Sequence, residues 1–300
     1  MGKKLLLVVN PVSGKARVKT ELFGILETFS RAGFSTEIYL TRGPGDGTRK
    51  VEEDGKGFDI IAACGGDGTL NEVVTGAMRI SFRGDLGFLP CGTTNDFASS
   101  LSIPKNLIRA SRLITEEEGK KLDFGAFNGE RFFSYIAVFG AFSDVSYTTD
   151  QRMKHVFGHV AYVFEAIAHL QEMRSYRVKV TCDGVLYEED VLFGATANSL
   201  SIGGVMKLKP DLVDMTDGYH EVLLVRNPKN AGEMAQLSRE LLSGNFKNQE
   251  VLFFRGKHVV FECEEEIPWC VDGEFAGNYH RAEVDNLHDK LRIIYPGKKD

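Results

Sequence analysis

The chain has 300 residues, of which 43% are hydrophobic, and its five cysteines include no Cys-x-x-Cys pair. This length favours two domains, and the odd number of cysteines favours reduced thiols over a disulfide framework or a zinc site. The formal net charge of −6 argues against a nucleic-acid-binding protein, whose surface is usually basic.

The N-terminus begins with an apolar run that is too short for a signal peptide. This run spans residues 5–9, and no small-residue cleavage site follows it. No apolar run elsewhere approaches the length of a membrane span. We therefore expect a cytoplasmic protein, which could still contact a membrane surface.

The first part of the chain alternates short apolar runs with segments of helical periodicity. We expect strands at residues 4–9, 35–40, 58–64 and 85–89, and helices at residues 16–32, 44–55, 69–79, 93–101 and 105–116. Such an alternation is typical of an α/β domain with a largely parallel sheet, which we place at residues 1–122. Ligands bind to sheets of this kind beyond the carboxyl ends of the strands.

Four polar loops follow the four expected strands. They are Asn10-Pro11-Val12-Ser13-Gly14-Lys15, the loop at Thr41, Gly65-Gly66-Asp67-Gly68 and Pro90-Cys91-Gly92-Thr93-Thr94-Asn95-Asp96. In the first loop, Ser13 can cap the next helix and the ammonium group of Lys15 could contact a phosphate. A capped helix start with an exposed lysine explains that loop equally well. Because the four loops share one edge of the sheet, we expect a ligand site there.

The third loop belongs to a longer pattern, Gly65-Gly66-Asp67-Gly68-Thr69-Leu70-Asn71-Glu72. It leads from a buried strand into a helix, whose N-terminal amides favour an anion, and its glycines let the main chain approach a phosphate closely. It matches neither the Rossmann nor the P-loop fingerprint. Since Asp67 would repel a phosphate, we expect its carboxylate to meet a metal, a proton or a hydroxyl.

The fourth loop can complete a nucleotide site. The hydroxyl of Thr93 or Thr94 can cap the next helix, and it can also bond to phosphate oxygens. Asn95 and Asp96 fall in the first turn of that helix, where the macrodipole favours a carboxylate whatever its function. This loop is therefore explained either as a helix start or as part of a phosphate site.

The second part of the chain, residues 123–300, is expected to be mainly antiparallel β-structure, in a sandwich or a barrel. We expect strands at residues 121–127, 131–139, 176–181, 185–197, 219–225, 249–254, 258–263 and 291–295, and helices at residues 156–173 and 230–242. The last strand could return to the first domain. Two Asp-Gly turns lie in this part, Asp214-Met215-Thr216-Asp217-Gly218-Tyr219 and Val271-Asp272-Gly273-Glu274, and each is explained as a turn between strands.

The three loop motifs of the first domain occur in an order and at a spacing that resemble one family. Asn10-Pro-x-Ser-Gly-Lys15, Gly65-Gly-Asp-Gly-Thr-x-Asn-Glu72 and Pro90-x-Gly-Thr-x-Asn-Asp96 resemble the diacylglycerol kinase catalytic-domain family of lipid kinases. That family includes bacterial soluble diacylglycerol kinases and the sphingosine and ceramide kinases. The Gly-Gly-Asp-Gly element alone is shared with NAD kinases and phosphofructokinases. The resemblance implies a three-layer α/β nucleotide-binding domain followed by a β-sandwich domain, with the active site in the cleft between them.

The resemblance also implies a set of site residues. Catalysis would involve Asp272 and Glu274 together with Asp67, and a structural Mg²⁺ would be held by Asp214, Asp217 and the carbonyl of Tyr219. ATP would be bound by Asn10, Pro11, Ser13, Gly14, Lys15, Thr41, Gly65, Gly66, Asp67, Gly68, Thr69, Asn71, Glu72, Gly92, Thr93, Thr94, Asn95 and Asp96. The residues do not decide whether Asp272 or Glu274 takes the hydroxyl proton.

The implied activity is the ATP- and Mg²⁺-dependent phosphorylation of diacylglycerol to phosphatidic acid. The lipid would be presented by a membrane surface, which would place the protein in the cytoplasm and at the inner face of the membrane, with no nucleic-acid partner. A homodimer is left open. The alternatives are a kinase for another lipid, a kinase for a soluble alcohol such as NAD, and a non-catalytic nucleotide- or lipid-binding regulator.

Overall fold

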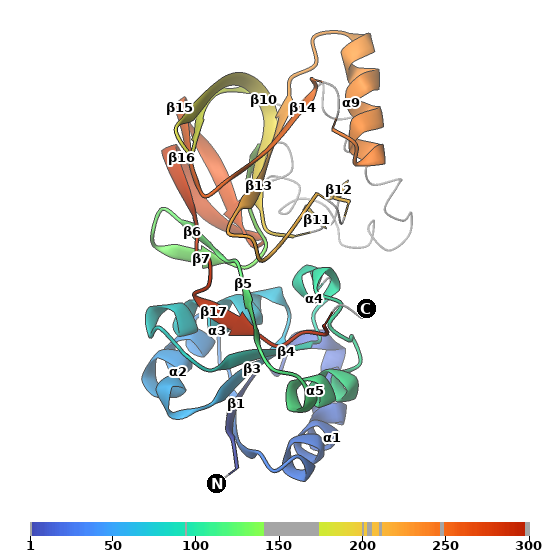
Figure 1. Ribbon diagram of the computed structural model, residues 1–300, viewed down its shortest axis with the longest axis vertical. Coiled ribbons are helices and arrows are strands. Elements are labelled where there is room, and N and C mark those ends of the chain that lie inside the picture. Colours follow the sequence, from blue (N-terminus) through green and yellow to red (C-terminus); the bar gives the residue numbers. More distant parts are fainter. Residues whose placement is uncertain are drawn as a thin grey trace. The chain divides into compact units, whose positions relative to one another are not determined.

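The computed structural model describes residues 2–93, 95–140, 174–199, 201–202, 206–209, 212–246 and 249–297. The helix expected at residues 156–173 lies outside them. The chain forms two compact units, one of Met1–Phe124 with His288–Asp300 and one of Gly125–Leu287 (Figure 1). Among the described residues, no helix combines the length and the hydrophobicity that a membrane span requires.

The first unit contains a six-stranded sheet with the order β2-β1-β3-β4-β17-β5. Its strands are β1 (Lys4–Val9), β2 (Ser35–Leu40), β3 (Ile60–Gly65), β4 (Asp85–Pro90), β5 (Lys120–Leu122) and β17 (Leu291–Ile293). All neighbouring pairs are parallel except β17 with β5. Every residue of β3 is buried, as expected for a central parallel strand covered on both faces.

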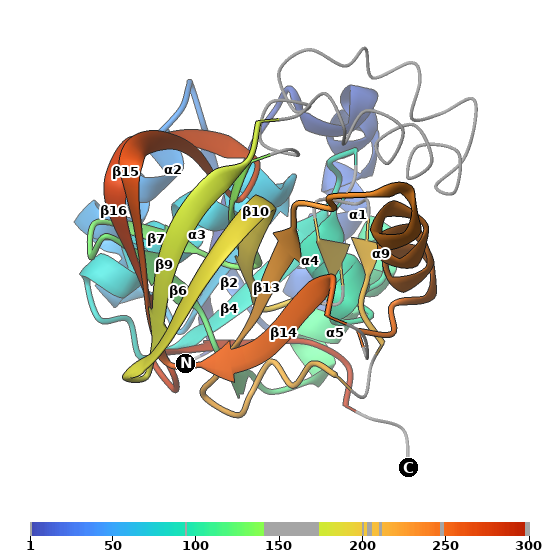
Figure 2. The same cartoon turned by 90° about the horizontal axis from the view of Figure 1, so that it is seen from above.

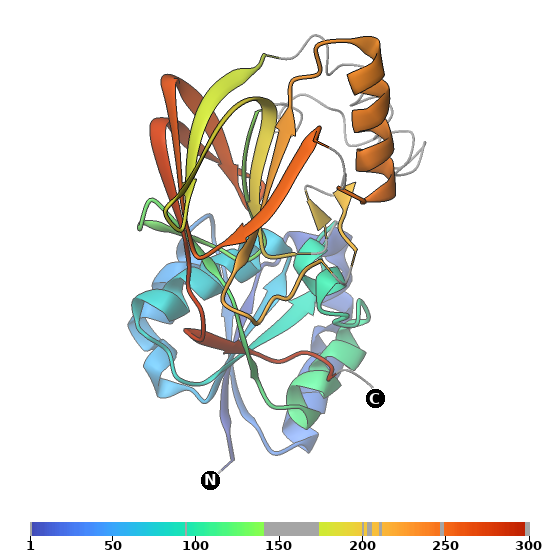
Figure 3. The same cartoon turned by 45° about the horizontal axis from the view of Figure 1, so that its top comes forward.

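Helices cover both faces of this sheet, which makes three layers (Figure 3). They are α1 (Arg17–Arg31), α2 (Asp46–Asp54), α3 (Asp67–Arg79), α4 (Asp96–Ser100) and α5 (Leu107–Glu116), with short 3-10 turns at Ser13–Ala16 and Gly55–Gly57. Helix α1 packs on α5, and α2 packs on α3. The expected α/β fold is confirmed. The bounds of its five α-helices and of β1 to β4 and β17 lie within three residues of the sequence-based ranges, and the largest shift is at the start of α4.

The chain leaves the first unit after Phe124 and re-enters it at His288. Two side-chain contacts join the leaving and returning segments within the first unit. The buried carboxylate of Asp123 lies 2.6 Å from Nδ1 of His288, and Lys121 pairs with Asp289 at 2.7 Å. The returning strand, β17, then pairs with β4 and β5, so the C-terminal strand completes the first sheet.

The second unit is mainly antiparallel and confirms the expected β-sandwich class. Its elements are β6 (Gly125–Phe127), β7 (Arg131–Phe133), β8 (Ile136–Gly140), β9 (Tyr176–Cys182), β10 (Val185–Ala197), β11 (Ser201–Ile202), β12 (Met206–Lys207), β13 (His220–Arg226), α9 (Ala231–Ser243), β14 (Val251–Gly256), β15 (His258–Val271) and β16 (Glu274–Asn286). The long strands β10 and β15 each pair with β8 near one end and with β9 near the other (Figure 2). These four strands enclose an aromatic core that includes Phe139, Phe261 and Trp269.

Three expectations for this unit were wrong in detail. The strand expected at residues 131–139 is divided into β7 and β8, which are separated by a turn at Ser134 and Tyr135. The sequence predicts a strand that ends near residue 263, but β15 continues to Val271, and the paired strand β16 was not predicted at all. The strand expected at residues 121–127 is divided into β5, which belongs to the first sheet, and β6, which belongs to the second.

Candidate active site

The four polar loops of the first unit begin at one edge of the sheet. Main-chain pairing continues just beyond the strands, because Asn10 N donates to Cys64 O at 2.9 Å and Thr41 N donates to Val9 O at 2.9 Å. The amide of Cys91 likewise donates to the carbonyl of Gly65 at 2.8 Å. The loops therefore share the carboxyl edge, where α/β sheets bind ligands.

Glycines let the main chains of three loops touch at this edge. Gly14 has φ +68°, and a Cβ atom there would lie 2.3 Å from the carbonyl oxygen of Cys91. A Cβ atom on Gly92 would lie 2.6 Å from Cα of Gly66. Neither position has room for a side chain, so the first, third and fourth loops form one surface made largely of main-chain groups.

The side chain of Asn10 turns inward and organises the first loop. Its Oδ1 accepts from the amide of Val12 at 3.1 Å, and its Nδ2 lies 3.3 Å from Oγ1 of Thr69 in α3. Asn10 thereby ties the first loop to the helix that follows the third. In the structure, the side chain of Asn10 positions the loops. The side chain of Lys15, another polar residue predicted to act in this loop, lies outside the described part of the chain.

Asp67 is the first residue of α3. The N-cap residue before it is Gly66, which has no side chain to cap the helix. The Oδ2 atom of Asp67 accepts from the amide of Asp96 at 3.2 Å, so this carboxylate lies where the fourth loop enters α4. The main-chain amides at the start of a helix attract anions. The structure thus brings Asp67 and Asp96 together beside the main-chain surface of the glycine loops. Of the two threonines that precede Asp96 in the fourth loop, Thr93 is exposed and Thr94 lies outside the described residues.

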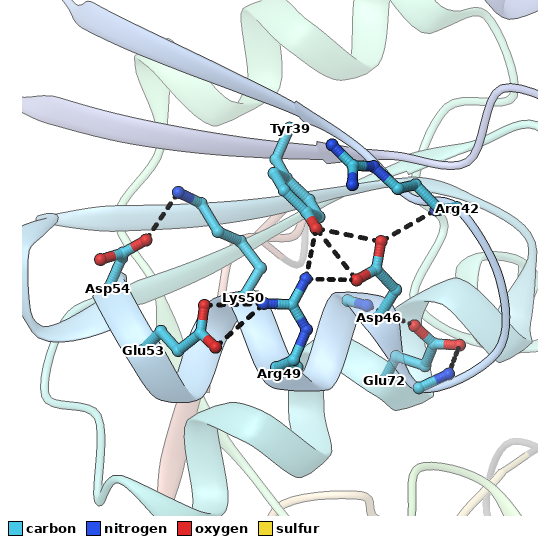
Figure 4. A network of polar contacts seen from close by, with 10 residues as sticks. Tyr39, Arg42, Asp46, Arg49, Lys50, Glu53, Asp54 and Glu72 are labelled. Carbon is cyan, nitrogen blue, oxygen red and sulfur yellow. Dashed lines mark hydrogen bonds and ion pairs between the residues drawn. The ribbon is translucent and has the colours of Figure 1, made fainter.

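Glu72 occupies a different position from the glycine turn of its own motif. Its Oε1 accepts from the amide of Gly45 and its Oε2 from the amide of Gly47, both at 2.8 Å (Figure 4). The hydroxyl of Thr48 donates to the carbonyl of Glu72 at 2.9 Å. The carboxylate therefore binds the loop between β2 and α2, the loop that also contains Thr41. The prediction that Glu72 contacts ATP stays untested.

A polar network holds the other side of that loop. Asp46 accepts from Arg42 N at 2.8 Å, from the hydroxyl of Tyr39 at 2.9 Å and from Arg49 at 2.6 Å (Figure 4). The hydrogen bond from Arg49, followed by that from the amide of Arg42, lowers the pKa of Asp46 below its ordinary value. Asp46 therefore stays ionised at neutral pH and holds the amide of Arg42, near the start of the loop, to the first turn of α2.

Cys64 and Cys91 lie buried under the third and fourth loops. A hydrogen bond with Cys91 and burial raise the pKa of the Cys64 thiol. All five cysteines are free, as the sequence predicts. A buried, protonated thiol is a poor nucleophile, so Cys64 serves packing rather than chemistry.

In the second unit, Asp272 and Gly273 form a two-residue hairpin turn between β15 and β16, and both have positive φ. Asp272 is buried, with 8% of the residue exposed, and its carboxylate accepts four hydrogen bonds. They come from the amide of Ser134 at 2.7 Å, its hydroxyl at 2.9 Å, and the amides of Tyr135 and Ile136 at 3.1 Å each. Asp272 is thus fixed against the turn between β7 and β8, whereas Glu274 is exposed at the start of β16.

The turn before β13 presents oxygen atoms. Asp214 Oδ1 accepts from the amide and the hydroxyl of Thr216 at 3.0 and 2.6 Å. Asp217 Oδ1 accepts from the amide of Tyr219 at 3.0 Å, and Oδ2 pairs with Arg255. Within the described part of the chain, no three His, Cys, Asp or Glu side chains form a metal cluster. Two carboxylates and main-chain carbonyls in one turn nevertheless make a donor set that fits Mg²⁺.

The sequence-based reading missed three contributions. It did not find Ser134 as a partner of Asp272, the Asp46 network, or the buried Asp123 that bonds to His288. The sequence contains a signal for Asp123, because this charged residue stands between the apolar residues Leu122 and Phe124. A carboxylate buried at such a position needs a partner. The other two depend on contacts between distant segments.

Comparisons with known proteins agree with this architecture. Residues 4–127 match the model of the diacylglycerol kinase catalytic domain, and residues 137–294 match the model of the YegS C-terminal NAD kinase beta sandwich-like domain. The chain is 30% identical over 300 residues to the diacylglycerol kinase of Bacillus subtilis (strain 168), covering 99% of this chain and 98% of that one.

A second relative and a solved structure, both named diacylglycerol kinases, are also similar to this chain along almost its whole length. The diacylglycerol kinase of Staphylococcus carnosus (strain TM300) is 32% identical, covering 99% of this chain and 96% of that protein. A crystal structure of a diacylglycerol kinase from Bacillus anthracis str. Sterne superposes with a TM-score of 0.77 at 25% identity, covering 98% of this chain and 97% of that one. The motif resemblance is confirmed: the chain belongs to the diacylglycerol kinase catalytic-domain family.

Proposed function

We propose that this chain is an ATP-dependent lipid kinase that transfers a phosphoryl group to the hydroxyl of diacylglycerol and so makes phosphatidic acid. The observation that carries the proposal is the main-chain contact of three glycine loops at the carboxyl edge of the sheet, one of them at the N-terminus of α3. Such a surface suits phosphate oxygens. The acceptor is taken from the relatives, which are named diacylglycerol kinases and match along almost their whole length.

The phosphates of ATP would contact the glycine loops and the first turn of α3. We assign to this site Asn10, Pro11, Ser13, Gly14, Lys15, Thr41, Gly65, Gly66, Gly68, Thr69, Asn71, Gly92, Thr93 and Thr94. Asn95 and Asp96 would hold the fourth loop in place, and Asp67 would bind the metal that accompanies ATP. When bound, Mg²⁺ offsets the negative charge of the phosphates.

The acceptor hydroxyl needs a group that takes its proton as the phosphoryl group arrives. We assign this step to Glu274, because it is exposed and can reach a substrate. The two oxygens of Asp272 already accept four hydrogen bonds, which suits a residue that fixes the hairpin carrying Glu274. Asp272 would therefore act mainly through the position of its neighbour.

A second metal position is proposed in the turn before β13. Asp214, Asp217 and the main-chain carbonyl of Tyr219 would hold a structural Mg²⁺, with Asp217 shared between the ion and Arg255. The chemistry of the donor set supports this assignment, since oxygen ligands suit a hard cation. Because diacylglycerol resides in membranes, we also propose that the enzyme works as a peripheral protein at the inner face of the membrane.

The experiment that tests this function is a transfer assay with labelled ATP and a panel of acceptors. Mixed micelles would carry diacylglycerol, ceramide or sphingosine, and NAD would serve as a soluble alcohol, because residues 137–294 also match an NAD kinase-like domain model. We expect label in phosphatidic acid, with Asp67→Asn reducing it by at least about a hundredfold. Asp54→Asn, at an exposed ion pair with Lys50, is the matched control. Label in NAD alone would refute the proposed acceptor.

A further inference from the structure

The loop between β2 and α2 has the features of a phosphate-binding loop that is already filled. The segment Gly43-Pro44-Gly45-Asp46-Gly47 covers the end of this loop and the first two residues of α2, and Gly45 stands at the N-cap of α2 with φ 77° and no side-chain cap. Helix α2 has nine residues, so its first amides form an anion-binding position. Without an internal partner, this position would compete for the phosphates of a nucleotide.

The carboxylate of Glu72 fills that position. Its two oxygens accept separately from the amides of Gly45 and Gly47, at 2.8 Å each (Figure 4). The fit is close, because a Cβ atom on Gly47 would lie 2.6 Å from Oε2 of Glu72. Hydrogen bonds of this kind, from amides to an ionised carboxylate, are stronger than those between neutral groups.

Glu72 and Asp67 lie on the same helix. Asp67 is the first residue of α3, beside the fourth loop, and Glu72, five residues further along the helix, reaches the second loop. On the opposite side of the second loop, Asp46 holds the amide of Arg42. Thr41 lies directly after β2 and directly before Arg42, so it adjoins the segment that these two attachments hold.

We infer that Glu72 is a positioning residue, which occupies the anion site of α2 from within and fixes the second loop to α3 before ATP binds. The inference rests on the proposed nucleotide site. The motif of residues 65–72 would then have two roles. Its glycines leave room for the phosphates of ATP. The carboxylate of Glu72, at its end, occupies the anion site of α2 and fixes the position of the Thr41 loop relative to α3. Glu72 itself then needs no contact with ATP.

The test uses a property that general destabilisation would not produce. In Glu72→Ala, the amides of Gly45 and Gly47 lose their anion, and a small carboxylate from solution can replace it. We expect KM for ATP to rise about tenfold, with kcat changed much less, and sodium acetate to restore KM where sodium chloride does not. Glu72→Gln keeps one oxygen acceptor and should give an intermediate KM.

Glu27→Gln is the matched control, because Glu27 forms an exposed ion pair with Arg31 within α1, away from the second loop and its polar network. Amide exchange of Gly45 and Gly47, measured by NMR, gives a readout that does not depend on activity. We expect both amides to exchange faster in Glu72→Ala, to be protected again by acetate, and to be unchanged in Glu27→Gln.

Unchanged exchange at Gly45 and Gly47 in Glu72→Ala would overturn the inference, and so would a rise in KM that chloride reverses as well as acetate does. If the wild-type chain transfers no phosphoryl group from ATP to any acceptor, the proposed function fails instead. The exchange measurement would then still decide whether Glu72 fixes the loop.

Discussion

Asn95 closes on the main chain of Gly92 through both ends of its amide: Oδ1 accepts from the Gly92 amide and Nδ2 donates to the Gly92 carbonyl, each at 2.9 Å. Asn95 is buried and has φ 52°, a conformation that asparagine tolerates better than most residues. The pair shapes the fourth loop from within. The close approach of Gly92 to Gly66 then depends on Asn95.

Replacing Asn95 should therefore loosen the loop that carries Thr93. Asn95→Ala loses both hydrogen bonds and adds strain at positive φ, which we expect to lower the free energy of unfolding by about 2 kcal/mol. Asn95→Gly loses the bonds without the strain and should cost less. Chemical denaturation of the two variants measures the difference. Equal stability of Asn95→Ala and the wild type would show that the closure of this loop contributes nothing.

Gly14 should tolerate no side chain. A Cβ atom would lie 2.3 Å from the carbonyl oxygen of Cys91, and the positive φ would add strain. We expect Gly14→Ala to separate the first and fourth loops and to weaken nucleotide binding by at least about tenfold, measured by calorimetric titration with ATP. Gly57→Ala, at a position with nothing within 4 Å, is the control and should bind like the wild type.

Asp272 and Glu274 should separate into a structural and a chemical role. Asp272→Ala leaves three buried amides and a hydroxyl without their acceptor, so we expect it to destabilise the fold by about 3 kcal/mol or more. Glu274→Gln should leave the melting temperature nearly unchanged and lower kcat by at least about a hundredfold. Thermal unfolding and initial rates on the same preparations check both. A Glu274→Gln enzyme with wild-type kcat would remove Glu274 as the proton acceptor.

The sequence predicts the first unit well because each of its central strands is a continuous apolar run that ends at a polar loop. Strand β16 escapes prediction for the opposite reason. Only Ala282 and Val284 of its residues are buried, and the remainder is polar, charged or only partly covered. The irregular pairing between Glu262 and Ile267 in β15 also interrupts the alternation that would have marked a long strand.

The site residues likewise divide into those that the local sequence predicts and those whose contacts depend on the fold. The glycine pattern at residues 65–68 predicts a main-chain surface from local chemistry alone. The partners of Glu72, by contrast, are amides 25 and 27 residues away, and those of Asp272 are up to 138 residues away. A motif indicates that a carboxylate is needed, but only the fold determines which amides it receives.

His220 makes stability depend on pH. It is fully buried and stacks on Phe133. Burial lowers its pKa to about 4, although a hydrogen bond with the main chain of Asp285 and the charge of that residue oppose the shift. The unfolded chain takes up the proton near pH 6.5, so the free energy of unfolding should fall as pH drops from about 6.5 to 4, by about 3 kcal/mol. His220→Leu should lose this component. Identical pH dependence in denaturation of the variant and the wild type would contradict the shift.

The proposed activity is tested most directly by measuring two products in one reaction. Diacylglycerol in mixed micelles is incubated with the full chain, ATP and Mg²⁺, and the ADP released and the phosphatidic acid formed are both quantified. We expect about one phosphatidic acid for each ADP, as phosphoryl transfer to the lipid requires. Release of ADP without phosphatidic acid would contradict a diacylglycerol kinase.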